Sequence, residues 1–315
     1  MYDKIFKLIE EHNTIVIASH IFPDGDAFGS QIGIKESLKA TYPNKNIFVV
    51  GSGLPDFFDL LGSVDEVTDD VFDDALAILL DANDINRFED QRITKVKTRI
   101  LIDHHLRQKV PFEVDAELVN EKACSTCEIV LDLIRNLKLQ IPQVCANALF
   151  LGMLTDTGRF QFVNDFPKVF HDAAFLLEHG ANPTAIYKVL NVVKENDLVV
   201  RSIIFAKLKR YKEGLLVSYL KYKDIKRLGL SSTQIANYVN ILANIENYPI
   251  WVVACEDKEG HVKFEFRSNK YVIQPVAAKY GGGGHAYACG LTLNNCTNQM
   301  FKAVIADLLA ILGDK

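Results

Sequence analysis

Short apolar runs that alternate with helical patterns constrain the fold of this chain most strongly. Four such runs, at residues 14–20, 46–50, 76–81 and 99–103, lie in the first third of the chain, and residues 27–40 between the first two have helical periodicity. Continuous apolar strands separated by helices are typical of a parallel sheet that is covered on both faces. The sequence therefore predicts an α/β fold whose N-terminal domain has a parallel sheet with helices on both faces.

Residues 125–190 are predicted to be helical. Ser125 and Glu128 place a hydroxyl and a carboxylate three residues apart before an apolar run, which is a helix-start signature. Further helices are expected at residues 144–154 and 168–179 and from Asn182-Pro183 onward.

The pattern changes after residue 190. A charged amphipathic helix is expected at residues 196–211. It is followed by a strand at 215–220, a helix at 231–245, a hairpin at 250–266 and a glycine run at 281–284. A final strand and a helix are expected in the C-terminal segment. The sequence thus predicts a first domain at 1–190, a connecting helix at 191–213 and a smaller α/β domain at 214–315.

Composition excludes several classes of protein. The chain has 35 Lys and Arg against 40 Asp and Glu, a net charge of −5, which argues against a protein that coats long duplex nucleic acid. No apolar run is long enough to span a bilayer and no signal peptide is recognisable, so a cytoplasmic location without membrane partners is expected. Cys124 and Cys127 have no second Cys-x-x-Cys to complete a zinc site, so both are predicted to be small buried residues.

Residues able to bind a metal follow three of the predicted strands and one helix. In chain order they are His20, Asp24 and Asp26, then Asp81, then Asp103, His104 and His105, and finally Asp156. Ligands collect at the carboxyl ends of strands in open parallel sheets, so we expect these side chains to converge. Each group alone could be a turn cap or an ion pair, but the combined N/O donor set suits Mn²⁺, with Mg²⁺, Co²⁺ or Fe²⁺ as alternatives. Two such cations can stabilise charge on a phosphoryl group.

These four motifs resemble, in order and spacing, those of the DHH phosphoesterase superfamily. The segments Pro23–Ala27 and Asp156–Phe160 are similar to its oligoribonuclease branch, the NrnA type. Gly281–Gly290 and Phe266–Ser268 resemble the glycine-rich and Arg-Ser motifs of the associated DHHA1 domain. The resemblance covers essentially the whole chain, and it implies a DHH domain and a DHHA1 domain with the active-site cleft between them.

The resemblance also implies roles for the matching residues. His20 and Asp24 would hold one divalent cation; Asp26, His104 and Asp156 would hold the second; Asp81 would bridge both in a two-metal mechanism. Asp103 would orient His104, and His105 would lie near the scissile phosphate and assist it.

The C-terminal half is expected to bind the substrate. Glycines allow backbone N–H groups to approach an anion closely, and an arginine can contact a phosphate through two hydrogen bonds. With the resemblance, these properties predict a set of substrate-binding residues: Arg267, Ser268, Gly282, Gly283, Gly284 and His285, together with Arg159 of the N-terminal half.

The activity implied is hydrolysis of short oligoribonucleotides and linear dinucleotides to mononucleotides, or of 3′-phosphoadenosine 5′-phosphate (pAp) to AMP. The same chemistry would serve a single-strand DNA exonuclease or a cyclic-dinucleotide phosphodiesterase. A non-catalytic nucleotide-binding module is the alternative from another class of protein. The apolar helical faces are also compatible with a homodimer.

Three further residue interpretations can be checked against the structure. Asp84 is expected to cap a helix although it could compete for a metal. Trp251 is predicted to lie in the core because its strand is apolar. Lys35 and Lys39 are predicted to form a solvated helix face.

Overall fold

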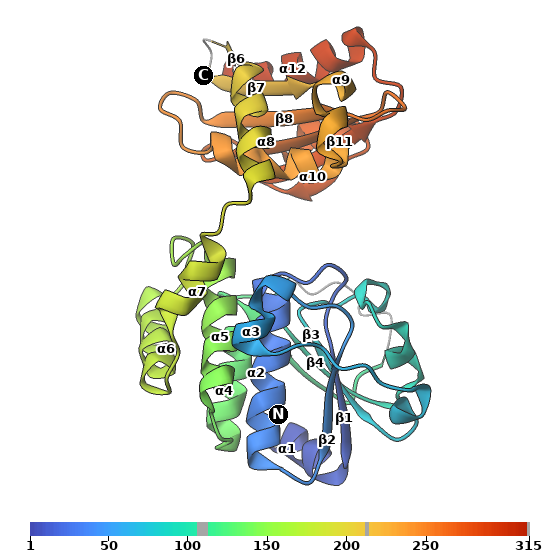
Figure 1. Ribbon diagram of the computed structural model, residues 1–315, viewed down its shortest axis with the longest axis vertical. Helices are drawn as coiled ribbons and strands as arrows, with labels where there is room; N and C mark the ends of the chain where they lie inside the picture. The colour runs from blue at the N-terminus through green and yellow to red at the C-terminus, as the bar shows by residue number, and fades with distance from the viewer. Residues whose placement is uncertain (106–112, 212–213, 314–315) are drawn as a thin grey trace. The chain divides into compact units, whose positions relative to one another are not determined.

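The computed structural model describes residues 1–105, 113–211 and 214–313 and contains two compact units, Met1–Val192 and Val193–Lys315 (Figure 1). Each unit has its own sheet and its own apolar core. No helix in the described ranges combines the length and the apolar character needed to cross a bilayer.

The N-terminal unit is built on a parallel sheet, as predicted, which has five strands where four were expected. Its strands are arranged in the order β2-β1-β3-β4-β5, and every neighbouring pair is parallel. The chain leaves β1 for β2 on one side and reaches β3 on the other, so a topological switch point lies between β1 and β3, where ligands bind in sheets of this order. The strands are β1 (Thr14–Ala18), β2 (Asn46–Val50), β3 (Leu76–Leu80), β4 (Thr98–Asp103) and β5 (Ala116–Val119). The half-buried β5 was not predicted, since it lacks a continuous apolar run.

The two faces of this sheet are covered differently. Helices α1 (Tyr2–Glu11), α2 (Gly25–Thr41), α4 (Thr126–Leu137) and α5 (Gln143–Asp156) contribute to the apolar core on one face. On the other face, loops and short 3₁₀ helices place Phe72, Phe88 and Ile93 against the sheet. The 3₁₀ helices of this unit are Pro55–Phe57, Asp69–Phe72, Ile85–Arg87 and Gln91–Lys95, and its remaining α-helices are α3 (Phe58–Leu61), α6 (Phe166–Glu178) and α7 (Pro183–Leu190).

Glycines bring α2 and α5 into unusually close contact. A Cβ added to Gly29 of α2 would lie 2.4 Å from the carbonyl oxygen of Ala148 on α5. A Cβ added to Gly152 of α5 would lie 2.2 Å from Cys127 Sγ and 2.9 Å from Asp26 Oδ1. Side chains at these positions would push the helices apart, so the glycines allow Asp26 to lie buried against α5.

The C-terminal unit has a six-stranded mixed sheet in the order β10-β11-β9-β8-β7-β6, in which only β7 and β8 are parallel neighbours. Helices α11 (Gln274–Lys279) and α12 (Asn298–Gly313) contribute to the core on one face, and α8 (Glu195–Ala206) and α10 (Ser232–Ala236) to that on the other. The strands are β6 (Leu208–Tyr211), β7 (Leu215–Leu220), β8 (Ile250–Glu256), β9 (Val262–Ser268), β10 (Gly283–His285) and β11 (Ala288–Leu293); α9 covers Tyr222–Ile225.

Two predicted helices are shorter than expected. The helix expected at 196–211 ends at Ala206, because residues 208–211 form β6 and pair with β7 in an antiparallel hairpin. The helix expected at 231–245 becomes a 3₁₀ helix (Asn237–Leu242) after Ala236. There Val239 and Leu242 are buried, and their three-residue spacing matches the 3₁₀ turn.

The prediction for Lys35 was wrong. Its side chain is 6% exposed, and its Nζ lies 2.7 Å from Asp65 Oδ2, thirty residues further along the chain. Burial of a lysine is expected only with such a partner. The predictions for Lys39, which is exposed, and for Trp251, which is buried in β8, are confirmed.

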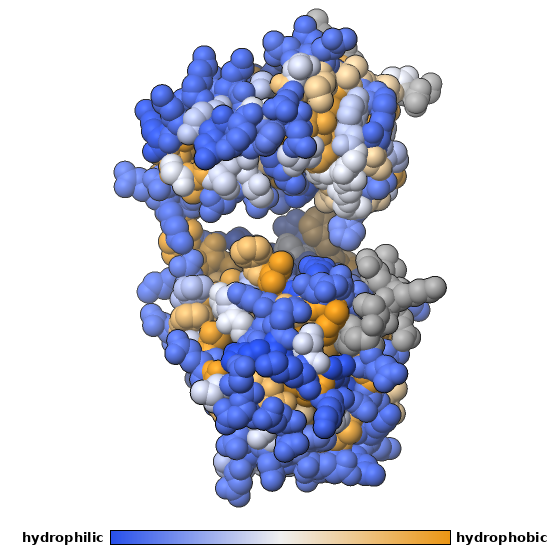
Figure 2. Space-filling model, turned by 90° about the vertical axis from the view of Figure 1, so that its right-hand side faces the viewer, coloured by the Kyte–Doolittle hydropathy of each residue, from blue (hydrophilic) through white to orange (hydrophobic). Residues whose placement is uncertain are grey.

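Large apolar side chains are also present on the surface. On the face seen in Figure 2, both units are covered mainly by hydrophilic residues, and hydrophobic side chains gather in separate patches. The most exposed large apolar side chain of the described residues is Phe22, which is 89% exposed.

Candidate metal centre

The loop after β1 carries the first candidate ligands. His20 Nδ1 lies 2.9 Å from the carbonyl oxygen of Ile21, and its Nε2 lies 3.5 Å from Asp81 Oδ2. Asp24 is the N-cap of α2, where Oδ1 accepts hydrogen bonds from the backbone N–H groups of Asp26 and Ala27 at 3.0 Å. The cap fixes the start of α2 and with it the buried carboxylate of Asp26.

Asp81 occupies the centre of the cluster. It follows β3 directly, has a left-handed backbone with φ of 60° and is 2% exposed. One carboxylate oxygen faces His20, while the other lies 3.6 Å from His104 Nε2. Asp81 therefore stands between a ligand carried by the first loop and one carried by the loop after β4.

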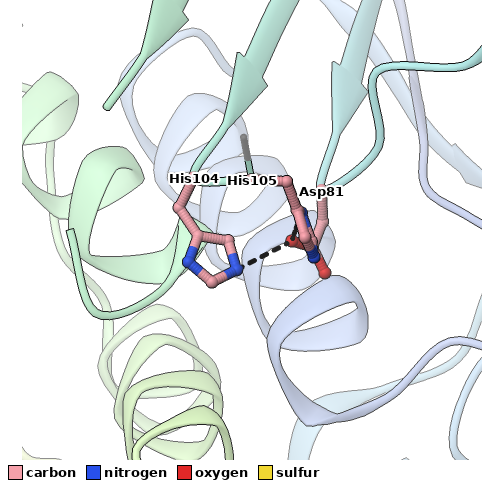
Figure 3. Close-up of side chains that lie close together, drawn as sticks. All are labelled: Asp81, His104 and His105. Carbon is pink, nitrogen blue, oxygen red and sulfur yellow. Dashed lines mark ion pairs between the residues drawn. The ribbon is translucent and has the colours of Figure 1, made fainter. Parts of the chain in front are cut away.

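The two histidines that follow β4 point toward Asp81 (Figure 3). His104 Nε2 also lies 3.4 Å from Asp156 Oδ2 and 3.8 Å from Asp26 Oδ2. Asp103 was expected to orient His104, but its Oδ1 instead lies 2.7 Å from Nδ1 of His105 and accepts the His105 backbone N–H. The buried carboxylate of Asp103 thus holds His105, while the ring of His104 faces Asp156.

The first turn of α4 holds two of the carboxylates in place, which the sequence did not predict. The backbone N–H groups of Thr126 and Cys127 donate to the two oxygens of Asp26 at 2.6 and 2.9 Å, and Thr126 Oγ1 donates to Asp81 Oδ1 at 2.8 Å. Free N–H groups at a helix N-terminus favour negative charge. The helix-start signature at Ser125 and Glu128 predicted where α4 begins, but it could not show that this helix end contacts Asp26 and Asp81.

The carboxylates are crowded enough to shift their protonation. Burial, followed by the charges of Asp81 and Asp156, raises the pKa of Asp26 well above its usual range. Burial raises the pKa of Asp156 to about 6, and the charge of Asp81 contributes further. A fully buried carboxylate such as Asp26 is costly without a positive partner, so the cluster is suited to divalent cations.

Two sets of donor atoms, which have no residue in common, could each hold one cation. Within each set the donor atoms lie no more than 4.8 Å apart: one set is His20, Asp24 and Asp81, and the other is Asp26, His104 and Asp156. A third set of Asp81, His104 and His105 overlaps both. The donors are imidazole nitrogens and carboxylate oxygens, which suit Mn²⁺ and its neighbours.

We predict that a divalent cation stabilises this protein more at neutral than at acidic pH. Because the folded-state pKa of Asp156 lies near 6, above the usual 3.8, its ionisation lowers the stability of the metal-free protein as the pH rises from about 4 to 6. Cation binding requires the ionised carboxylate and relieves this repulsion. At a Mn²⁺ concentration one hundred times Kd, the Tm at pH 7.5 should rise by roughly 5–10 °C.

The measurement is a set of thermal melts with and without Mn²⁺ at pH 5 and 7.5. The Tm shift caused by Mn²⁺ should be much smaller at pH 5 than at pH 7.5. In Asp156→Asn, this shift should depend less on pH. Equal shifts at both pH values would contradict the prediction.

We also predict that Thr126→Val lowers metal affinity or turnover by about 10- to 100-fold, the usual effect of losing a hydrogen bond to a metal ligand. Valine keeps the shape and the backbone N–H to Asp26 but removes the hydroxyl that holds Asp81. Thr126→Ser restores the donor and is the matched control. Equal activity of Thr126→Val and Thr126→Ser would show that the hydroxyl is not needed.

Arg159 lies in a tight turn after Asp156. Gly158, Arg159 and Phe160 all have left-handed backbones, with φ of 57°, 65° and 63°. The guanidinium lies 5.4 Å from the centre of the Tyr187 ring, and one Nη donates to Asn191 at 2.9 Å. Arg159 is thus exposed and held against the end of α7, and its role toward a substrate stays a prediction.

The predicted substrate-binding residues of the C-terminal unit lie along neighbouring strands. Arg267 of β9 pairs with Ala288 of β11, which in turn pairs with His285 of β10. Arg267 Nη1 lies 3.0 Å from Glu265 Oε2, and His285 is exposed. The glycine run is not a free loop, because Gly283 and Gly284 belong to β10, the end strand of the sheet.

Ser268 differs from the other members of this predicted set. It is 8% exposed, and its hydroxyl oxygen accepts the backbone N–H groups of Lys270 and Tyr271 at 3.1 and 2.8 Å. In the described structure its hydroxyl closes the turn after β9. A contact between Ser268 and a substrate stays a prediction.

Family comparisons agree with this two-unit architecture. The model of the DHH family, N-terminal domain, matches residues 14–153, and that of the DHHA1 domain matches residues 212–314. A solved structure of an exopolyphosphatase-related protein from Bacteroides fragilis is 26% identical, with a TM-score of 0.87 over 99% of this chain and 97% of that one. The chain belongs to the DHH family, and the resemblance predicted from its motifs is confirmed.

Two similar relatives within the DHH family have names that state an activity. The bifunctional oligoribonuclease and PAP phosphatase NrnA of Bacillus subtilis is 31% identical over 311 residues, which cover 98% of this chain and 97% of the relative. The protein of the same name from Mycoplasma genitalium is 32% identical over 306 residues, covering 95% of this chain and 94% of the relative.

Proposed function

We propose that this chain is a metal-dependent phosphoesterase that hydrolyses short oligoribonucleotides and linear dinucleotides to mononucleotides, and pAp to AMP. The observation that carries the proposal is a pair of neighbouring donor sets at the switch point of the parallel sheet, where Asp81 Oδ1 of one set lies 3.6 Å from His104 Nε2 of the other. The substrate class comes from relatives named as oligoribonuclease and PAP phosphatase, which align with nearly the whole chain.

We propose two divalent cations, with Mn²⁺ as the preferred ion. His20 and Asp24 would hold one; Asp26, His104 and Asp156 would hold the other; Asp81 would contact both. When bound, such cations lower the pKa of water and offset charge on a phosphoryl group. The protein's part is to fix these donors through the Asp24 cap and the first turn of α4.

His105 is proposed to donate a proton or a hydrogen bond to the phosphate ester. The hydrogen bond that His105 Nδ1 donates to Asp103 raises the pKa of His105, which favours its protonated form near neutral pH. Its side chain is 40% exposed, so a substrate can reach it, whereas His104 faces the carboxylates. The two adjacent histidines would therefore have different tasks.

Residues 1–190 are proposed to carry the chemistry, residues 214–315 to bind the substrate, and residues 191–213 to connect them. In the C-terminal unit, Arg267 and His285 offer positive or hydrogen-bonding groups, and the glycines of β10 offer backbone N–H groups on a sheet edge. These groups suit a terminal phosphate.

The test is a turnover panel with Mn²⁺ that compares pAp, the dinucleotide pApA, an RNA five-mer, a short DNA, a cyclic dinucleotide and pyrophosphate. Preference for pAp, pApA and short RNA would support the proposal. Preference for DNA or for the cyclic dinucleotide would favour a different substrate for the same chemistry. Binding of these ligands and Mn²⁺ without any turnover would favour a non-catalytic nucleotide-binding module.

A homodimer is part of the proposal. Phe166, Phe170 and Leu177 of α6 are 45%, 53% and 45% exposed and would supply an apolar contact surface. Sedimentation of the wild type and of Phe170→Glu measures the oligomeric state. A monomeric wild type would remove the dimer and leave the catalytic proposal unaffected.

A further inference from the structure

Phe22 combines two properties that are unfavourable for the fold alone. Its side chain is 89% exposed, and its backbone is left-handed, with φ of 53°. A non-glycine residue is disfavoured in that region, and an exposed phenyl ring gains almost nothing from burial. Glycine or asparagine would fit this backbone more easily.

The conformation of Phe22 is held from both sides. On one side, Ile21 donates its N–H to the carbonyl oxygen of Arg87 at 2.8 Å, and His20 forms a β-bridge with Phe88. On the other, Pro23 is buried, and the Asp24 cap fixes the start of α2. A residue that precedes proline prefers an extended backbone, so these flanking contacts override the local preference of Phe22.

Other left-handed residues of this chain have a local explanation. Of the eight non-glycine residues with positive φ in the described ranges, three are asparagines, which tolerate this region, and Lys138 ends α4 as its left-handed C-cap. The remaining four either are candidate metal ligands or lie within four residues of one along the chain: Phe22, Asp81, Arg159 and Phe160. Strained residues of this kind concentrate at functional sites.

Phe162, the next most exposed phenylalanine among the described residues, differs from Phe22. It is 75% exposed, but its ring lies so close to Gly158 that a Cβ added there would be 2.9 Å away. The ring of Phe162 therefore packs on its own turn. Phe22 is therefore the stronger candidate for an exposed ring that contacts a ligand.

We propose that Phe22 is a stacking platform for a nucleobase of the substrate, next to the scissile phosphate. It is two residues from His20 and two from Asp24, so a base on its ring would belong to a nucleotide adjoining the metal centre. Every base has a π-face, so such a platform would bind nucleotides with little sequence preference. This inference rests on the proposed function and adds a recognition element for the base.

The first experiment compares KM and kcat for pApA and for two analogues that each lack one base. Phe22→Ala should raise KM for pApA by about 5- to 150-fold, the range for loss of one stacked base, with a smaller change in kcat. It should have little effect on the analogue that lacks the stacked base. Phe22→Leu keeps the apolar bulk without the ring and should behave like Phe22→Ala.

The matched control is Phe6→Ala. Phe6 is 42% exposed on α1, in the same unit but before the amino end of β1, and its loss should leave KM unchanged. A KM for pApA that stays within twofold in Phe22→Ala would overturn the proposal. So would an equal rise for pApA and for both analogues, because that pattern would indicate a disturbed metal centre.

A binding measurement separates this inference from the proposed function. Phe22→Trp retains a stacking ring and adds an exposed indole, while the native Trp251 is 5% exposed and serves as background in the wild type. AMP should quench the fluorescence of Phe22→Trp far more than that of the wild type, even if pApA is not a substrate. Quenching without turnover of pApA would contradict the proposed function alone, whereas turnover without quenching would contradict the role of Phe22.

Discussion

Asp81→Asn is expected to lower kcat by at least about 100- to 1000-fold, because Asp81 is the residue that we propose to contact both cations. It lies between the imidazoles of His20 and His104, with one carboxylate oxygen toward each. Asparagine keeps the shape but carries no charge and only one acceptor oxygen. Loss of a single preorganised electrostatic group typically costs 10²–10³ in kcat, and both proposed cations would depend on this one.

The matched control for this prediction is Asp84→Asn, three residues away. Asp84 was expected to cap a helix, and its Oδ1 accepts the backbone N–H of Asn86 at 3.0 Å at the start of a 3₁₀ helix. Asparagine caps equally well, so activity should stay within about twofold. Mn²⁺ binding by calorimetry should fall in Asp81→Asn and stay unchanged in Asp84→Asn. More than a tenth of wild-type activity in Asp81→Asn would show that the site has been assigned wrongly.

The sequence located the candidate ligands because each stands at the end of an apolar strand or helix. Strand ends in a parallel sheet share one edge, so the convergence of residues as distant as His20 and His104 follows from topology. The sequence could not show which hydrogen bonds hold those ligands in place. The support that Asp26 receives from Thr126 and Cys127 depends on the packing of α4 against residues a hundred positions earlier.

The errors have the same origin. Lys35 looked like a surface residue because its partner, Asp65, is distant in sequence. The family resemblance implied that Asp103 orients His104, whereas in the structure Asp103 Oδ1 lies 2.7 Å from His105 Nδ1; this choice depends on side-chain rotamers that a motif does not encode. Helix 196–211 was too long because the β6–β7 pairing, a tertiary contact, overrode local periodicity.

Arg267→Ala is expected to lower kcat/KM for pAp and pApA by about 10- to 100-fold, mainly through KM. The guanidinium is held by Glu265 at 3.0 Å and by the carbonyl oxygen of Phe266 at 2.8 Å. These contacts fix its position without using all five of its N–H donors. A hydrogen bond between charged groups contributes roughly 1.5–3 kcal/mol, which corresponds to about 10- to 150-fold.

Steady-state kinetics with three variants test this prediction. Arg267→Lys keeps the charge but cannot make two parallel hydrogen bonds, so it should recover only part of the loss. Arg210→Ala removes an exposed arginine from β6, at the far edge of the same sheet from β10, and should have no effect. If Arg267→Ala changes kcat/KM no more than Arg210→Ala, Arg267 does not bind the substrate. Glu265 also forms an ion pair with Lys263 at 3.2 Å. In that case, a Tm that falls in Glu265→Gln but not in Arg267→Ala would show that Glu265 stabilises the fold through Lys263 and not through Arg267.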